Sequence, residues 1–241
     1  MIKDIREKHE NVLLLDCGDL FFQRKDRSKL RAEISIEGLN LMKYDALNLG
    51  EGELSFGFDF LTKMTQKTSV PLVSANILDK SRRKGIAPEY LLKEFNGFKV
   101  CIIGIVSPDY FKEANLIKDG LVIDDPEETL KRVLFEIKAK QVDIVVLLSH
   151  IGVGSTKRLV QKTAGIDVAI AGHGSLIIDS PQLAGKTLVV QNSFQGRYLG
   201  LLHLTLSPDG SIVKYQGEKV QLSDDISDDP EVVALIKRFK D

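Results

Sequence analysis

The sequence predicts an α/β protein, and three observations support that class. Short apolar runs rich in β-branched residues alternate with segments whose apolar residues recur at helical spacing. A capping aspartate followed by proline marks two helix starts, at Asp125-Pro126 and Asp229-Pro230. Several apolar runs also end in a polar residue that a metal could use. The first two observations set the fold class, and the third points to a site.

The first third of the chain predicts a helix, a strand, a second helix and a second strand. Ile2 and Ile5 share one side of a charged opening segment, as in the tail of an amphipathic helix. The apolar run 12–15 is typical of a buried strand, and helical spacing follows over about 30–44. Residues 71–75 then predict a short buried strand.

The middle of the chain continues the alternation with β-branched runs and a well-marked helix. The predicted elements are a strand over 99–106, a helix from Asp125 to about Lys140, a strand ending at His150, a helix over about 155–164 and a strand leading to His173. This order is typical of βαβ units and a parallel sheet.

From Thr187 onward the spacing between strands shortens. Strands are expected over 188–191, 198–206 and 211–222, with the turn 207–210 joining the last two, and all three are predicted to be antiparallel. A closing helix follows from Asp229 to Ile236.

Composition limits the classes of partner. The 241 residues carry a formal net charge of -1, which supplies no long-range field for nucleic acid, and no apolar run is long enough to span a bilayer. We therefore expect neither a nucleic acid nor a membrane partner. Cys17 and Cys101 lie in or beside apolar runs and are expected to be buried thiols. No linker or repeat divides the chain, so residues 1–241 are predicted to form a single domain.

Three of the apolar runs end in Asp19, His150 and His173. Ligands of open α/β sheets bind outside the carboxyl ends of strands, so we expect these side chains to converge on one sheet edge. Each has an ordinary alternative, since an aspartate can merely cap a turn and a strand-end histidine can merely be hydrogen-bonded. Their order along the chain favours the ligand interpretation.

That order resembles the calcineurin-like metallophosphoesterase superfamily, and within it the N-terminal catalytic domain of the 5'-nucleotidase family. The segments that carry the resemblance are Gly18-Asp19, Gly50-Glu51-Gly52-Glu53, Leu148-Ser149-His150 and Gly172-His173-Gly174-Ser175, together with Ser74-Ala75-Asn76-Ile77 and Gly196-Arg197-Tyr198-Leu199-Gly200. The resemblance implies a four-layer sandwich of two packed mixed sheets flanked by helices. The first strand of that fold and the C-terminal nucleotide-specificity domain are expected to be missing.

The resemblance also implies which residues hold metal. The family binds two divalent metals through D-x-H, GD, GNHE, a strand-end histidine and GHxH, and one of the two sites maps onto Asp19, Glu51, His150 and His173. Two carboxylates and two imidazoles suit zinc, manganese or iron. Glu51 replaces the family asparagine, and a glutamate in a glycine-flanked loop is also a common solvated residue. The second site retains only Asp19 and is predicted to be empty.

The departures from the family pattern predict weakened chemistry. Gly52 stands where the family has the histidine that contacts the phosphoryl group, Ser175 replaces the second GHxH histidine, and D-x-H is absent. Losing such a histidine typically slows a reaction about 100- to 10,000-fold, so no catalytic residue is assigned. Asp16 and Glu53 are expected to orient or cap neighbouring groups, whereas His9, His203 and Arg197 are left outside the site.

Three functions stay open at this stage. The first is a metal-dependent phosphoester hydrolase of the 5'-nucleotidase type, acting weakly on a small phosphate ester or nucleotide. The second is a catalytically degenerate domain that keeps one metal for stability or ligand binding. The third is a fragment of a larger exported protein whose upstream sequence supplies D-x-H, which family habit would place in the periplasm or cell envelope. Protein partners are not predicted.

Overall fold

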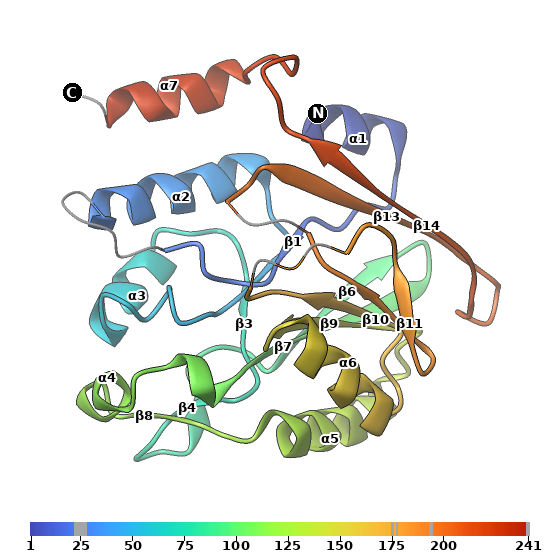
Figure 1. Cartoon of the computed structure of the whole chain (residues 1–241), viewed down its shortest axis with the longest axis horizontal. Helices are drawn as coiled ribbons and strands as arrows, with labels where there is room; N and C mark the ends of the chain where they lie inside the picture. Colours follow the sequence, from blue (N-terminus) through green and yellow to red (C-terminus); the bar gives the residue numbers. More distant parts are fainter. Residues whose placement is uncertain (22–27, 175, 177, 193–194, 240–241) are drawn as a thin grey trace.

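The structure is a computed structural model that describes residues 1–21, 28–174, 176, 178–192 and 195–239. Its helices and strands stack in layers, with α2 and α7 on one outer side and α5 and α6 on the other (Figure 1). The helices are α1 Ile2–Lys8, α2 Ser28–Met42, α3 Phe58–Thr65, α4 Glu113–Lys118, α5 Pro126–Ile137, α6 Val153–Lys162 and α7 Pro230–Arg238, with 3-10 turns η1 Pro108–Tyr110 and η2 Lys138–Lys140.

The strands form four hydrogen-bonded sheets in the described part of the chain. They are β1 Leu15–Asp16, β2 Ala46–Asn48, β3 Leu72–Val73, β4 Ile77–Asp79, β5 Lys84–Gly85, β6 Tyr90–Phe95, β7 Phe98–Val106, β8 Leu121–Ile123, β9 Ile144–His150, β10 Val168–Ala171, β11 Gln182–Ala184, β12 Thr187–Val190, β13 Tyr198–Leu206 and β14 Ile212–Gln221.

The largest sheet has the strand order β11-β12-β10-β9-β7-β6. Its four central strands are parallel, and β6 and β11 pair antiparallel at the two edges. A small parallel sheet, β1-β2-β3, packs against it, and β13-β14 and β5-β4-β8 are separate antiparallel sheets. Parallel pairing places the carboxyl ends of β9 and β10 at one edge.

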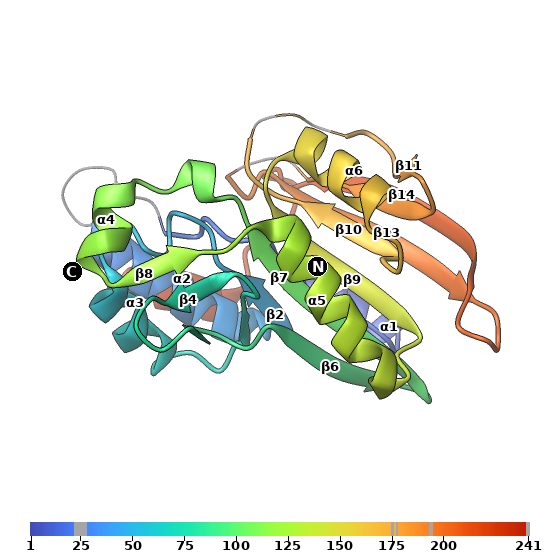
Figure 2. The ribbon, with the colours of Figure 1, turned by 90° about the horizontal axis from the view of Figure 1, so that it is seen from below.

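Alternation along β7 explains the layers. Cys101, Ile103 and Ile105 are buried against α5 and α6, whereas Val100 and Ile102 face the small sheet and β13. On the far side of the small sheet, α2 packs on β2 (Figure 2). The result is helix, large sheet, small sheet and helix, which confirms the four-layer sandwich of metallophosphoesterases.

Most predicted elements lie where the sequence places them, but the expectation of antiparallel pairing holds only in part for the strand after Thr187. β12 runs parallel to β10 inside the large sheet, and its antiparallel partner is β11, which the sequence did not indicate. A four-residue apolar run shows burial but carries no signal of strand direction. β6 was also missed, although it forms a hairpin with β7. The antiparallel pairing of β13 with β14 was predicted correctly.

Asn48, the last residue of β2, ties the two sheets together. Its side chain is fully buried, and Nδ2 donates to the carbonyls of Ile105 at 2.9 Å and Leu148 at 3.2 Å, with that of Cys17 at 3.5 Å. These bonds satisfy the buried Nδ2 and link β2 to the backbones of β7 and β9.

A helix that crosses a bilayer must be both long and apolar. None of the helices in the described part of the chain meets both conditions.

Candidate metal centre

Four potential ligands come together at the carboxyl ends of strands from two different sheets. Asp19 and Glu51 lie in the loops that follow β1 and β2 of the small sheet. His150 ends β9, and His173 lies two residues beyond β10, both in the large sheet. The expectation that they share the edge of one sheet is therefore wrong in detail. The carboxylates come from one sheet and the imidazoles from the other.

The distances within this cluster are short. Glu51 reaches both rings, with Oε2 at 2.9 Å from His150 Nε2 and Oε1 at 3.1 Å from His173 Nδ1. Asp19 Oδ2 lies 3.4 Å from the first nitrogen and 4.0 Å from the second. One ligand atom from each of the four residues lies within 4.8 Å of all the others. Among the described residues, one group of at least three His, Cys, Asp or Glu side chains could hold an ion. This cluster is that group.

The tautomer of His150 follows from its surroundings. Nδ1 lies 2.9 Å from the carbonyl oxygen of Cys17, and a carbonyl can only accept, so Nδ1 carries a proton. Nε2 therefore faces Glu51 and Asp19 either as a second N–H of an imidazolium or as a lone pair aimed at a cation. A lone pair facing two carboxylates without a cation would be repulsive. Positive charge at this point, from a proton or a divalent metal, would relieve that repulsion.

Without a metal, protons supply that charge. Burial works against the charged imidazole, but hydrogen bonds to Asp19 and Glu51 outweigh it and raise the pKa of His150 to about 10. Burial likewise opposes ionisation of Asp19, yet the bonds from His150 and from the Gly52 N–H keep its pKa below the usual value. A cation binding here would have to displace the His150 proton.

Glu53 organises the loops that carry the two carboxylates. It is fully buried, and its oxygens accept backbone N–H groups from Gly50 at 2.7 Å, Asp19 at 2.8 Å, Leu20 at 2.7 Å and Phe21 at 3.2 Å. Burial raises its pKa to about 7, more than these backbone bonds lower it. The expectation that Glu53 supports neighbouring groups agrees with these contacts, and Asp16 similarly accepts the Gly18 N–H.

Two of the four residues have an unusual backbone conformation, with a positive φ. Asp19 has a φ of 64° and His173 a φ of 59°, in the left-handed region that non-glycine residues adopt infrequently. Such conformations cost free energy and tend to persist where the surrounding structure fixes a functional group.

Position 52 has no room for a side chain. A Cβ built on Gly52 would lie 2.2 Å from the carbonyl oxygen of Phe21, and the Gly52 N–H donates to Asp19 Oδ1 at 2.7 Å. The loop is therefore closed over the place where the family pattern has a histidine. Ser175, the other substituted position, lies outside the described residues.

The cluster has an aromatic neighbour that the sequence does not indicate. Tyr110, at the end of η1, stacks on His173 with ring centroids 3.4 Å apart and an interplanar angle of 7°. It follows no recognisable motif, so only the folded contact shows it. His9 and His203 lie together elsewhere on the surface, with centroids 5.4 Å apart, and both cysteines are buried as expected.

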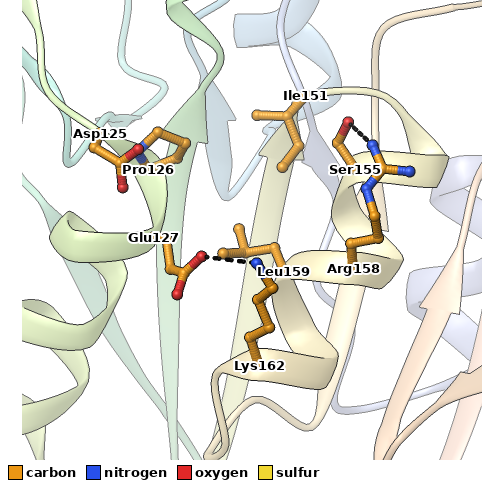
Figure 3. Close-up of a pocket in the computed structure, with 8 residues that line it drawn as sticks. All are labelled: Asp125, Pro126, Glu127, Ile151, Ser155, Arg158, Leu159 and Lys162. Carbon is orange, nitrogen blue, oxygen red and sulfur yellow. Dashed lines mark hydrogen bonds and ion pairs between the residues drawn. The ribbon is translucent and has the colours of Figure 1, made fainter.

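The described surface also has a cleft away from the metal ligands. It has a volume of about 210 Å³ and lies between the start of α5 and the side of α6 that faces it (Figure 3). Glu127 and Lys162 form an ion pair of 3.6 Å across it, and Arg158 bonds Ser155 at 3.0 Å. Because these charges already pair with one another, the cleft does not compete with the cluster as a candidate site.

A four-layer α/β fold with carboxylates and imidazoles gathered at the strand ends defines a metallophosphoesterase-like domain. Solved structures with the same fold include the calcineurin-like phosphoesterase YfkN from Bacillus subtilis, with a TM-score of 0.84 and 26% identity over 99% of this chain and 86% of that one. Another is the 5'-nucleotidase precursor from Thermus thermophilus, with a TM-score of 0.84 and 25% identity over 99% of this chain and 51% of that one.

Sequence comparison agrees with the structural one. A snake venom 5'-nucleotidase from Naja atra is 30% identical over 265 residues, covering 99% of this chain and 49% of the venom protein. No protein-family model matches the chain. The chain shares the fold of the calcineurin-like phosphoesterases and is similar in sequence to the N-terminal domain of the 5'-nucleotidases. Almost the whole of this chain matches these curated relatives. The chain spans about half of their length.

Proposed function

We propose that this chain holds one divalent cation (zinc, manganese or iron) through Asp19, Glu51, His150 and His173 and hydrolyses small phosphate esters weakly. The observation that carries the proposal is the convergence of four ligand atoms within 4.8 Å of one another. Two carboxylates would balance the charge of the cation, and two imidazoles would complete a mixed N/O donor set.

Each residue of such a site would have a separate role. A bound cation would supply Lewis acidity, polarising a phosphoryl oxygen and making water a better nucleophile. Glu51 lies close to a nitrogen of each ring, Asp19 lies 3.4 Å from His150 Nε2, and the Cys17 carbonyl holds His150 with Nε2 facing them. The Gly52 N–H is already bonded to Asp19 and does not offer itself to a substrate. We expect no second cation, and therefore weak turnover.

The substrate class proposed is a small phosphate ester or a nucleotide. Relatives named 5'-nucleotidase, and the Bacillus subtilis trifunctional nucleotide phosphoesterase, motivate the nucleotide.

The test is phosphate release from p-nitrophenyl phosphate and from a nucleoside monophosphate, with added manganese or zinc. The native chain should release phosphate faster than His173→Ala, which lacks one proposed ligand, whereas His203→Ala should match the native chain. Equal rates for native chain and His173→Ala would refute the hydrolase proposal.

A second candidate is a degenerate domain that keeps one cation for stability or ligand binding. The observation favouring it is the closed backbone at Gly52, 2.2 Å from the Phe21 carbonyl oxygen when a Cβ is built. Elemental analysis of protein purified without chelators separates the candidates. Bound metal without phosphate release supports the degenerate domain, and absence of metal counts against both.

A further inference from the structure

Tyr110 is the aromatic residue that packs on the candidate metal centre. Its ring is nearly parallel to that of His173, at 7° and 3.4 Å, and meets that of His150 edge-on, at 85° and 6.3 Å. A single phenol therefore contacts both imidazoles of the cluster, one through its face.

The phenol is itself fixed at two points. Its hydroxyl donates to the carbonyl of Ile151, the residue after His150, at 3.0 Å. Its backbone belongs to η1, whose entry is capped by Ser107, and the Ser107 N–H donates to the His150 carbonyl at 3.3 Å. Tyr110 is thereby bound to the end of β9 through both its backbone segment and its side chain.

His173 needs such support more than His150 does. His150 is 1% exposed and belongs to a buried strand, whereas the His173 side chain is 29% exposed and lies in a loop beyond β10. The stack covers one face of the imidazole and leaves Nδ1 pointing at Glu51 Oε1, 3.1 Å away, and at His150 Nε2, 3.3 Å away. An imidazole made positive by a proton or a cation is also attracted to the face of a phenol.

We propose that Tyr110 is a positioning residue that holds the His173 imidazole in the orientation in which Nδ1 can bind a cation. The inference rests on the proposed metal centre. Groups that orient metal ligands typically change metal affinity roughly 10- to 100-fold when removed. Stacking is a weaker constraint than a hydrogen bond, so the lower end of that range applies here.

The first experiment follows cobalt binding by its visible spectrum. Tyr110→Leu removes the aromatic face and should weaken Co²⁺ binding about 10-fold and change the ligand-field bands. Tyr110→Phe keeps the face and loses only the bond to Ile151, so it should stay within about threefold of the native chain. Tyr215→Leu, an exposed tyrosine on β14, is the matched control and should leave binding unchanged. Thermal unfolding of the metal-free variants checks that they fold.

The second experiment uses no metal, so it separates the fate of this inference from that of the metal centre. In proton NMR of the metal-free chain, the stacked phenol should shift the His173 ring protons upfield. Tyr110→Phe should retain that shift and Tyr110→Leu should lose it. His173 signals that are the same in native chain and Tyr110→Leu would overturn the inference. A native chain that shows the shift but binds no cobalt would overturn the metal centre alone.

Discussion

The two sides of the candidate site keep very different amounts of the family pattern. On the cation side, Asp19, Glu51, His150 and His173 come from four strand ends and still meet within 4.8 Å. On the phosphoryl side, Gly52 replaces a histidine, and its loop lies too close to Phe21 for any side chain. The proposed ligands end or follow four different strands, whereas the phosphoryl contact of the family pattern depends on a single loop position. Cation binding and catalysis can therefore be lost separately.

The largest expected effect concerns the cation side. Asp19→Asn should weaken manganese binding roughly 100-fold, because it removes one of two carboxylate charges, and asparagine tolerates the φ of 64° at this position. Isothermal titration with Mn²⁺ measures it. Asp59→Asn, an exposed residue of α3, is the matched control. Equal affinity for native chain and Asp19→Asn would show that Asp19 is no ligand.

The next effect tests the phosphoryl side. Gly52→Ala should lower the free energy of unfolding by about 1–3 kcal/mol, since its Cβ would overlap the Phe21 carbonyl oxygen. Gly38→Ala on α2, whose Cβ would come no closer than 4.0 Å to Met42, should be neutral or stabilising. Denaturant unfolding of both variants decides the matter. A stable Gly52→Ala would mean that the loop opens easily and that the lost histidine could be restored.

The smallest expected effect concerns Glu53, which bonds the backbone of the loops that carry both sides of the site. Burial raises the pKa of this carboxyl from 4.5 to about 7, so the native state binds its proton more tightly than the unfolded state. The stability that this proton contributes is complete below pH 4.5 and is lost as the pH rises through 7. Between pH 6 and 8 the native chain should lose about 1 kcal/mol relative to Glu53→Gln.

Denaturant unfolding of both proteins at several pH values measures that difference. If the native chain instead gains stability relative to Glu53→Gln as the pH rises, Glu53 is ionised in the folded protein. The backbone N–H groups that would hold it so are those of Gly50, Asp19, Leu20 and Phe21.

Much of the fold could be predicted because its signals are local. The helix starts at Asp125 and Asp229 follow from capping chemistry, and both aspartates accept backbone N–H bonds in the structure. Strand direction depends on partners far along the chain. For this reason the sequence does not reveal the parallel pairing of β12 with β10, or the strand β6.

The candidate site shows the same division. Asp19, His150 and His173 could be proposed from strand ends, and Glu51 from the order of motifs, because a strand end points its residue at a sheet edge. The stacking of Tyr110 on His173 has no local signature. That residues 1–241 form a single domain, and that one cation is bound, stay predictions.

The buried amide of Asn48 has a consequence for how such a protein can diverge. Its Nδ2 contacts the backbone of Cys17 and Leu148, each two residues before a proposed ligand, and Asn48 itself lies three residues before Glu51. One side chain therefore joins the backbone segments that lead to three of the proposed ligands, Asp19, Glu51 and His150. Substitutions in the outer helices would leave these bonds in place, whereas a substitution of Asn48 would remove the bonds that join β2 to the backbone before Asp19 and before His150.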